Sequence, residues 1–204
     1  MNQMFTYNQE QAVAGSAGGG GEYLTESAVV KCRIDSARWT TGTNGSQSGF
    51  LELDVTTESG QKANYLRICH TKRDGTQNEF GQAQIQSLMG VTGVKGLTSK
   101  QHGTDMVCPE LIGKPVSLAL ERENYIKGDG KPGFKFEIKA IMSSLSGKTV
   151  AEHVGNQQPE TAGYWAERFK ANPQGSAPKQ TQQAAPAQAG YSQPPADFDD
   201  DIPF

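Results

Sequence analysis

The chain of 204 residues is 35% apolar, a low share for a wholly globular protein, and it is rich in glycine (24 residues) and proline (10). It has no run of about 18 apolar residues and no signal peptide, so neither a membrane-spanning helix nor a secreted protein is expected. The net charge is −3, but without the four aspartates of the last eight residues the chain carries 19 basic and 18 acidic side chains, which leaves a polyanionic ligand open.

The chain divides into a central body and two polar ends. Residues 1–21 end in four consecutive glycines, which predicts a flexible arm. Residues 172–196 consist mainly of Gln, Ala, Pro and Gly, and they predict a disordered linker because they have too little apolar surface to offset the entropy of ordering. An acidic tip, 197–204, follows it. One folded domain is therefore expected over residues 22–171.

Alternation of apolar and polar residues predicts three consecutive antiparallel strands at the start of this domain. They cover residues 29–39, 50–55 and 63–68. Segments rich in turn-forming residues, 41–49 and 58–61, separate them. The short connections predict a meander, in which each strand pairs with the next one along the chain.

The period changes from two to about 3.6 after the third strand. Apolar residues three or four apart predict a helix over 83–89 that ends at Gly90, and residues 93–105 have the composition of a loop. Two further strands are predicted over 116–120 and 134–141. A basic hairpin loop, 127–133, joins these two strands, and a short helix over 164–170 ends the domain.

Three strands, a helix and two strands is the order of the five-stranded Greek-key OB barrel. A closed barrel suits a single domain of this size because closure removes exposed strand edges. We therefore expect an all-β fold with one short helix between strands and disordered tails. A β-sandwich is the alternative that the pattern leaves open.

Few residues in the chain suit catalysis or metal binding. Cys32, Cys69 and Cys108 are far apart and no C-x-x-C pair occurs, which favours small buried thiols in a reducing cytoplasm over a metal site. Glu121 and Glu123 would share one face of a strand, as a catalytic carboxylate pair could, but no histidine accompanies them. P-loop, dinucleotide and nucleophile-elbow motifs do not occur. We expect no enzymatic activity and no cofactor.

Aromatic and basic residues alternate at three places in the body. Between residues 31 and 154 the body contains 16 basic and 13 acidic side chains, so it is mildly basic. Unpaired bases stack on aromatic faces, and phosphates bind cations. Trp39, at a strand end, and Tyr65, expected to point outward, are the best stacking candidates. For Phe50, Phe134 and Phe136 a place in the core is the alternative to stacking on bases. For the basic turn at 72–73 the alternative is a solvated surface turn without a role in binding. The candidates are Arg33, Arg38, Trp39, Tyr65, Arg67, Lys72, Arg73, Tyr125, Lys127, Lys131, Phe134 and Lys135.

The end of the chain, Asp199-Asp200-Asp201-Ile202-Pro203-Phe204, resembles the acidic tip of bacterial single-stranded DNA-binding proteins. That resemblance implies a segment on which enzymes of replication, recombination and repair dock. Such a partner would offer a small apolar pocket for Phe204 and basic groups for the carboxylates. On composition alone, a solubilising acidic tail is the alternative.

Segments of the body are similar to phage-encoded single-stranded DNA-binding proteins: residues 21–27 (GEYLTES), Asp54 with 60–65 (GQKANY), 111–116 (LIGKPV) and 146–152 (SGKTVAE). The resemblance implies an OB-fold domain that protects single-stranded DNA without sequence specificity during phage replication and recombination, in the cytoplasm of a bacterial host. The implied partners are single-stranded DNA and host or phage enzymes on the tip, with a homo-oligomer left open. The alternative is a protein-interaction adaptor that binds no nucleic acid.

Overall fold

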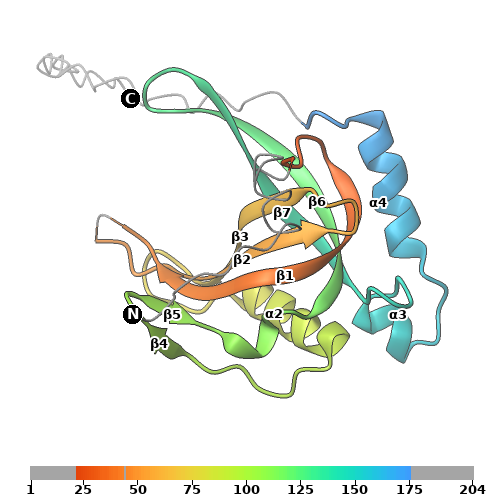
Figure 1. Ribbon diagram of the computed structural model, residues 1–204, viewed down its shortest axis with the longest axis horizontal. Helices are drawn as coiled ribbons and strands as arrows, with labels where there is room; N and C mark the ends of the chain where they lie inside the picture. Colours follow the sequence, from red (N-terminus) through yellow and green to blue (C-terminus); the bar gives the residue numbers. More distant parts are fainter. Residues whose placement is uncertain (1–21, 44, 176–204) are drawn as a thin grey trace, which may run out of the picture.

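The computed structural model describes residues 22–43 and 45–175 (Figure 1). Within these residues, seven strands form one antiparallel sheet, accompanied by three α-helices and one turn of 3-10 helix. The predicted arm, the linker from residue 176 onward and the acidic tip lie outside the described residues. The expectation of a mostly β domain is confirmed, but the described residues contain three α-helices, where the sequence predicted one between strands and one at the end of the domain.

The predicted meander is present and its strands are longer than the alternation indicated. It consists of β1 (Ala28–Thr41), β2 (Gly49–Thr57) and β3 (Lys62–Thr71). Leu51 of β2 pairs with Ile68 of β3, and both side chains are buried. The alternate residues point to the other side of these strands, which we call the outer face.

A second hairpin, β6 (Pro115–Ile126) and β7 (Pro132–Met142), completes the main sheet. The first half of β1 pairs with β6, where Ala28 lies opposite Leu120, and its second half pairs with β2. One long, bent strand therefore belongs to both hairpin systems. Figure 1 shows the tip of the β6–β7 hairpin projecting beyond the rest of the body.

Helix α2 (Glu79–Thr92) packs against β3 and β7 and buries Ile85 and Leu88 in the main core. The predicted stop at Gly90 is three residues early, because the helix ends at Gly93, whose φ of 70° is left-handed. This conformation is typical of a helix C-terminus and is favourable for glycine. The helix thus covers one open end of the sheet.

Short elements account for most of what the pattern missed. The predicted loop contains a hairpin, β4 (Lys100–His102) and β5 (Asp105–Val107), and the chain then forms the 3-10 turn Pro109–Leu111. Helix α3 (Val150–Val154) was not predicted, and α4 (Glu160–Ala171) begins four residues before its predicted start. Elements of three to five residues are too short for a hydrophobic period to be recognised.

The prediction of a closed five-stranded barrel is wrong, because the sheet of the described residues does not close. The ladder order is β3-β2-β1-β5-β4, with β6 on β1 and β7 on β6. Strands β3 and β7 lie against each other, but no ladder joins them in the described part of the chain. Other segments use the free edge of β3: Leu24 donates its N–H to Lys62 at one end, and Asn78 donates to His70 at the other. The sheet therefore keeps an open seam between β3 and β7.

Helix α4 packs on the opposite side of β6 and β7 from α2 and forms a second, smaller core with Phe169 buried against Ala119 and Met142. This arrangement covers both sides of the β6–β7 hairpin base. No helix in the described ranges has the length and apolar character needed to cross a membrane. The seam, the outer face and the projecting hairpin are among the exposed surfaces that these layers leave.

Candidate nucleic-acid interface

A cleft of about 300 Å³ lies at the seam between β3 and β7. Four aromatic side chains line it, and three of them are exposed: Tyr65 is 67% exposed, Tyr23 55% and Phe134 38%, whereas Phe136 is buried. Lys62 and Lys135 also line this seam cleft. The cleft therefore combines exposed ring faces with ammonium groups, which is the chemistry that unpaired bases and their phosphates require.

Tyr65 points outward as predicted, and a β-bulge holds it there. Asn64 and Tyr65 of β3 together oppose the single residue Asp54 of β2. Tyr65 has a φ of 59°, in the left-handed region that residues with a side chain seldom occupy. The Asp54 carboxylate accepts the Tyr65 N–H at 2.9 Å. A strained backbone that its neighbours hold in place is a common property of binding sites.

A row of charged side chains crosses the outer face beside Tyr65. Arg38, Glu52 and Arg67 occupy one register position on β1, β2 and β3. The Glu52 carboxylate accepts from Arg38 Nε at 2.9 Å and from Arg67 Nε at 2.6 Å. Arg38 also pairs with Asp54 at 2.9 Å, and its guanidinium lies 6.0 Å from the Tyr65 ring centroid.

The glutamate of this row is nearly inaccessible, with a side chain only 4% exposed. Burial would raise the pKa of Glu52, but hydrogen bonds from Arg67 and Arg38 outweigh it and hold the pKa below its ordinary value. Glu52 is therefore charged at neutral pH and offsets much of the positive charge of both arginines. Arg67 keeps more freedom than Arg38, because 55% of its side chain is exposed against 24%.

Phe134 is fixed in the cleft by two neighbours. The Arg122 guanidinium lies 4.1 Å from the Phe134 ring centroid, and the Phe136 ring meets it edge-on at 5.7 Å. Arg122 is itself anchored, since its Nε donates to Asn124 Oδ1 at 2.9 Å. The core interpretation holds for Phe136, which is 9% exposed, and fails for Phe134. An arginine stacked on a ring leaves the opposite ring face for a base.

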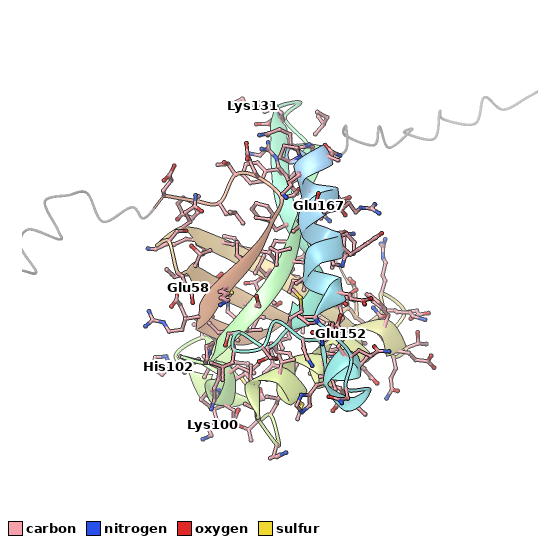
Figure 2. All side chains as sticks on the ribbon, turned by 90° about the vertical axis from the view of Figure 1, so that its right-hand side faces the viewer. Glu58, Lys100, His102, Lys131, Glu152 and Glu167 are labelled. Atoms are coloured by element: carbon pink, nitrogen blue, oxygen red, sulfur yellow. The ribbon has the colours of Figure 1, made fainter. Side chains whose placement is uncertain are left out.

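The β6–β7 hairpin carries three more predicted residues. Tyr125 is 40% exposed, and its ring and the Lys127 side chain both lie over Gly133, which has no side chain in the way. Lys131 stands at the tip of the hairpin (Figure 2) and pairs loosely with Asp129 at 3.7 Å. Tyr125 lies opposite Gly133 and Phe134 lies opposite Asn124, so the Tyr125 side chain is on the other face of the hairpin from Phe134.

Trp39, the other leading candidate, does not lie with Tyr65. It pairs across the sheet with the buried Leu51 and so shares the core-facing side of β1. Its indole N–H donates to the Thr98 carbonyl at 3.1 Å, and its ring meets His70 edge-on at 5.4 Å. The side chain is half-buried and packs against the main core. Trp39 therefore lies beside the core and outside the seam cleft, and its role in DNA binding stays a prediction.

The remaining predicted cations lie apart from the cleft. Arg33 pairs with Asp35 at 3.3 Å, near the β1 end that pairs with Pro115 of β6. Lys72 and Arg73 are exposed in the turn after β3, and neither has an ion pair within the described residues. Both a solvated turn and a role in DNA binding therefore stay open for them. The protein-docking candidates, residues 199–204, lie outside the described residues.

The structure thus brings together Tyr65, Phe134 and Lys135 in the cleft, with Arg38 and Arg67 beside it. Three residues of the site were missed: Tyr23, Lys62 and Arg122. The first two lie in sequence segments that carried the phage-protein resemblance, which could have drawn attention to them. Arg122 had no such signal.

Possible enzymatic groups are engaged in structural contacts. Glu121 pairs with Lys139 at 3.0 Å and Glu123 with Lys135 at 2.8 Å. No group of three potential metal ligands exists in the residues that the structure describes. Burial raises the pKa of the Cys32 thiol to about 12 and that of Cys108 to about 11, whereas Cys69 is only half-buried.

No protein-family model matches this chain, and no curated protein matches it significantly. A function therefore has to be inferred from the chemistry of the seam cleft and from the motifs in the sequence.

Proposed function

We propose that the chain binds single-stranded DNA without sequence specificity, in the manner of a phage-encoded OB-fold protein that protects DNA during replication and recombination. The gathering of Tyr23, Tyr65 and Phe134 around one cleft with Lys62 carries the proposal. Each ring offers a face to any base, because every base has a π-face, so no sequence preference is needed. Stacking would contribute about 1–3 kcal/mol per base.

The topology supports an OB-type arrangement. The order β1, β2, β3, helix, β6, β7, with β6 paired to β1, is that of a partly open Greek-key barrel with the β4–β5 hairpin inserted. OB folds bind oligonucleotides on the face of strands 2 and 3 and on the loop between strands 4 and 5. The corresponding parts here are the outer face of β2 and β3 and the projecting β6–β7 hairpin.

The charges around the cleft favour a site in which stacking matters more than ion pairing. Lys62 and Lys127 have no ion pair in the described ranges, while Arg38, Arg67 and Lys135 already contact carboxylates. A phosphate would compete with Glu52 for the half-exposed Arg67. It would therefore gain less binding free energy there than at an unpaired cation. We therefore expect a shallow dependence of affinity on salt, with a slope of about −0.7 for each phosphate neutralised.

The test is a titration of a fluorescently labelled oligonucleotide followed by anisotropy. Tyr65→Ala and Phe134→Ala should each weaken binding by about 1–3 kcal/mol. Tyr164→Ala is the matched control, because Tyr164 is also an aromatic residue, 59% exposed, but lies on α4 away from the cleft. Equal losses in all three variants, or a preference for duplex over single strand, would refute the proposed site.

The acidic tip supplies the second part of the proposal, the recruitment of replication and recombination enzymes. Its support is the residue order at 199–204, since the tip lies outside the described residues. Phe204→Ala should remove the docking of host proteins on immobilised chain and leave oligonucleotide binding unchanged. Full retention of these proteins by the variant would mean that the tip serves only solubility.

The alternative function is a protein-interaction adaptor that binds no nucleic acid. One observation favours it, namely that Arg38, Arg67 and Lys135 are already neutralised by neighbouring carboxylates. The titration above separates the two functions directly, because an adaptor would leave the anisotropy of the oligonucleotide unchanged at any protein concentration.

A further inference from the structure

A second exposed surface surrounds the loop that follows β7. Leu145 stands at the tip of the loop 143–148 and is 93% exposed, more than any other large apolar side chain described. One cavity lies on each side of it. We call this region the Leu145 surface. It borders α3, and Figure 2 shows Glu152 of α3 and Lys131 of the hairpin beyond opposite ends of α4.

The first cavity is apolar with one lysine at its border. It has a volume of about 310 Å³ and is lined by Val91, Leu145 and Val150, with Lys148 and His153 beside them. An aromatic or branched aliphatic side chain could enter it. A carboxylate of the same or a neighbouring residue would then lie near Lys148. The cavity thus suits an apolar residue next to a negative charge.

The second cavity, of about 480 Å³, lies between Leu145 and the end of the β1–β2 pair. Lys31 and Arg33 line it, and Glu58 is the carboxylate among its lining residues. Arg33 pairs with Asp35, but Lys31 and Lys148 have no ion pair in the residues that the structure describes. The Leu145 surface therefore has an apolar ridge with unpaired cations on both sides.

These features complement the last eight residues of the chain. Residues 197–204 carry four aspartates, interspersed with Phe198, Ile202 and Phe204, in an extended acidic and apolar sequence. We propose that this segment docks on the Leu145 surface of its own chain. An apolar side chain of the segment fills the first cavity, and its carboxylates face Lys31 and Lys148. This proposal does not depend on DNA binding.

The tether is long enough for this contact. The described chain ends at Gly175, beyond α4, and 21 residues, 176–196, precede the acidic segment. A flexible tether of that length spans roughly 25 Å. Helix α4 has 12 residues and is about 18 Å long. Its first turn is joined to α3, since Thr161 donates its N–H to Glu152 Oε1 at 2.7 Å, and α3 borders the first cavity.

Charge favours the Leu145 surface over the seam cleft for this segment. Three of the cations of the cleft and outer face, Arg38, Arg67 and Lys135, already pair with carboxylates, so an acidic peptide there would displace existing partners at all but Lys62. On the Leu145 surface it would meet unpaired lysines. The docked segment would therefore leave the cleft accessible, so that the chain could hold its terminus and a ligand at the same time.

Nuclear magnetic resonance of the ¹⁵N-labelled full chain tests this contact. We expect the amide signals of Leu145, Lys148 and His153 to shift between the wild-type chain and Phe204→Ala, while Gly128 in the hairpin stays unchanged. Leu145→Asp should shift the amide signals of Ile202 and Phe204 in return. The exposure of Leu145 makes this substitution compatible with folding. Shifts at Lys62 and Tyr65 instead, or no shifts at all, would overturn the proposal.

A charge reversal provides the matched control. Lys148→Glu should abolish the difference between the wild-type tip and Phe204→Ala, whereas Lys95→Glu, an exposed lysine in the loop after α2, should preserve it. Repeating the comparison at tenfold lower protein concentration separates docking within one chain from docking between chains. Shifts that disappear on dilution would overturn docking on the same chain.

Discussion

The bulge at Tyr65 predicts that two substitutions will differ in stability but not in DNA binding. Tyr65→Gly and Tyr65→Ala both remove the exposed ring, but only glycine adopts a φ of 59° without strain. We expect the glycine variant to be more stable than the alanine variant. Both variants should bind single-stranded DNA more weakly than the wild-type chain, to the same degree.

The magnitude follows from two opposing effects. A left-handed conformation costs a residue with a side chain about 1–2 kcal/mol. Glycine also makes the unfolded chain more flexible, which destabilises the folded state by about 0.4–1 kcal/mol relative to alanine. The glycine variant should therefore exceed the alanine variant in unfolding free energy by about 1 kcal/mol. The ring itself contributes little to this comparison, because it is 67% exposed and both variants lack it.

Urea unfolding followed by tryptophan fluorescence measures the stabilities, since Trp39 packs against the main core and Trp165 against the α4 core. Oligonucleotide anisotropy measures the binding of the same samples. A glycine variant that is less stable than the alanine variant would refute the strain argument. Unchanged binding by both variants would instead refute the role of the ring.

Three further substitutions test other parts of the structure. Glu52→Gln should lower the unfolding free energy at pH 7 by about 2 kcal/mol in urea unfolding, because the nearly inaccessible carboxylate that pairs with both arginines loses its charge. Burial alone would raise the pKa of Glu152, but hydrogen bonds from two backbone N–H groups outweigh it and lower the pKa to about 2. The charged Glu152 therefore stabilises the folded protein fully at any pH above the ordinary carboxyl pKa. This stabilisation should disappear as the pH falls towards 2, and the difference between wild type and Glu152→Gln in an acid titration should shrink over that range. Gly81→Ala should destabilise by about 1–3 kcal/mol in thermal unfolding, because its Cβ would lie 1.7 Å from the Cys69 carbonyl oxygen, whereas Gly96→Ala, with open space around it, should be neutral.

The long strands could be predicted from the sequence because each has one buried face. In β3, Leu66 and Ile68 alternate with exposed residues, and this pattern was sufficient to predict the outward direction of Tyr65. The bulge places Ala63 and Leu66 on the buried face although they are three residues apart, and it was not predictable because a small residue such as Ala63 is compatible with either face. The left-handed φ depends on the Asp54 carboxylate, which is eleven residues away in sequence.

Sequence reasoning failed where a side chain's role depends on a partner from another strand. Arg122 stacks on Phe134 because β6 and β7 pair in one register, and nothing within either segment indicates that contact. Similarly, Arg38 and Arg67 have the composition of a phosphate site, but Glu52 lies between them in the sheet. The open seam also arises from tertiary packing, because residues 22–24 and α2 use the ends of the β3 edge that a closed barrel would have paired.

The different environments of the three thiols give this protein a natural site for a covalent probe. Maleimides and methanethiosulfonates react with the thiolate, which is scarce at the buried Cys32 and Cys108 because burial raises both pKa values. Cys69 on β3 is only half-buried, so we expect it to react first among the three thiols that the sequence contains. A fluorophore or spin label can therefore be attached to the wild-type chain without removing any cysteine. It would report from the same strand that forms one wall of the seam cleft.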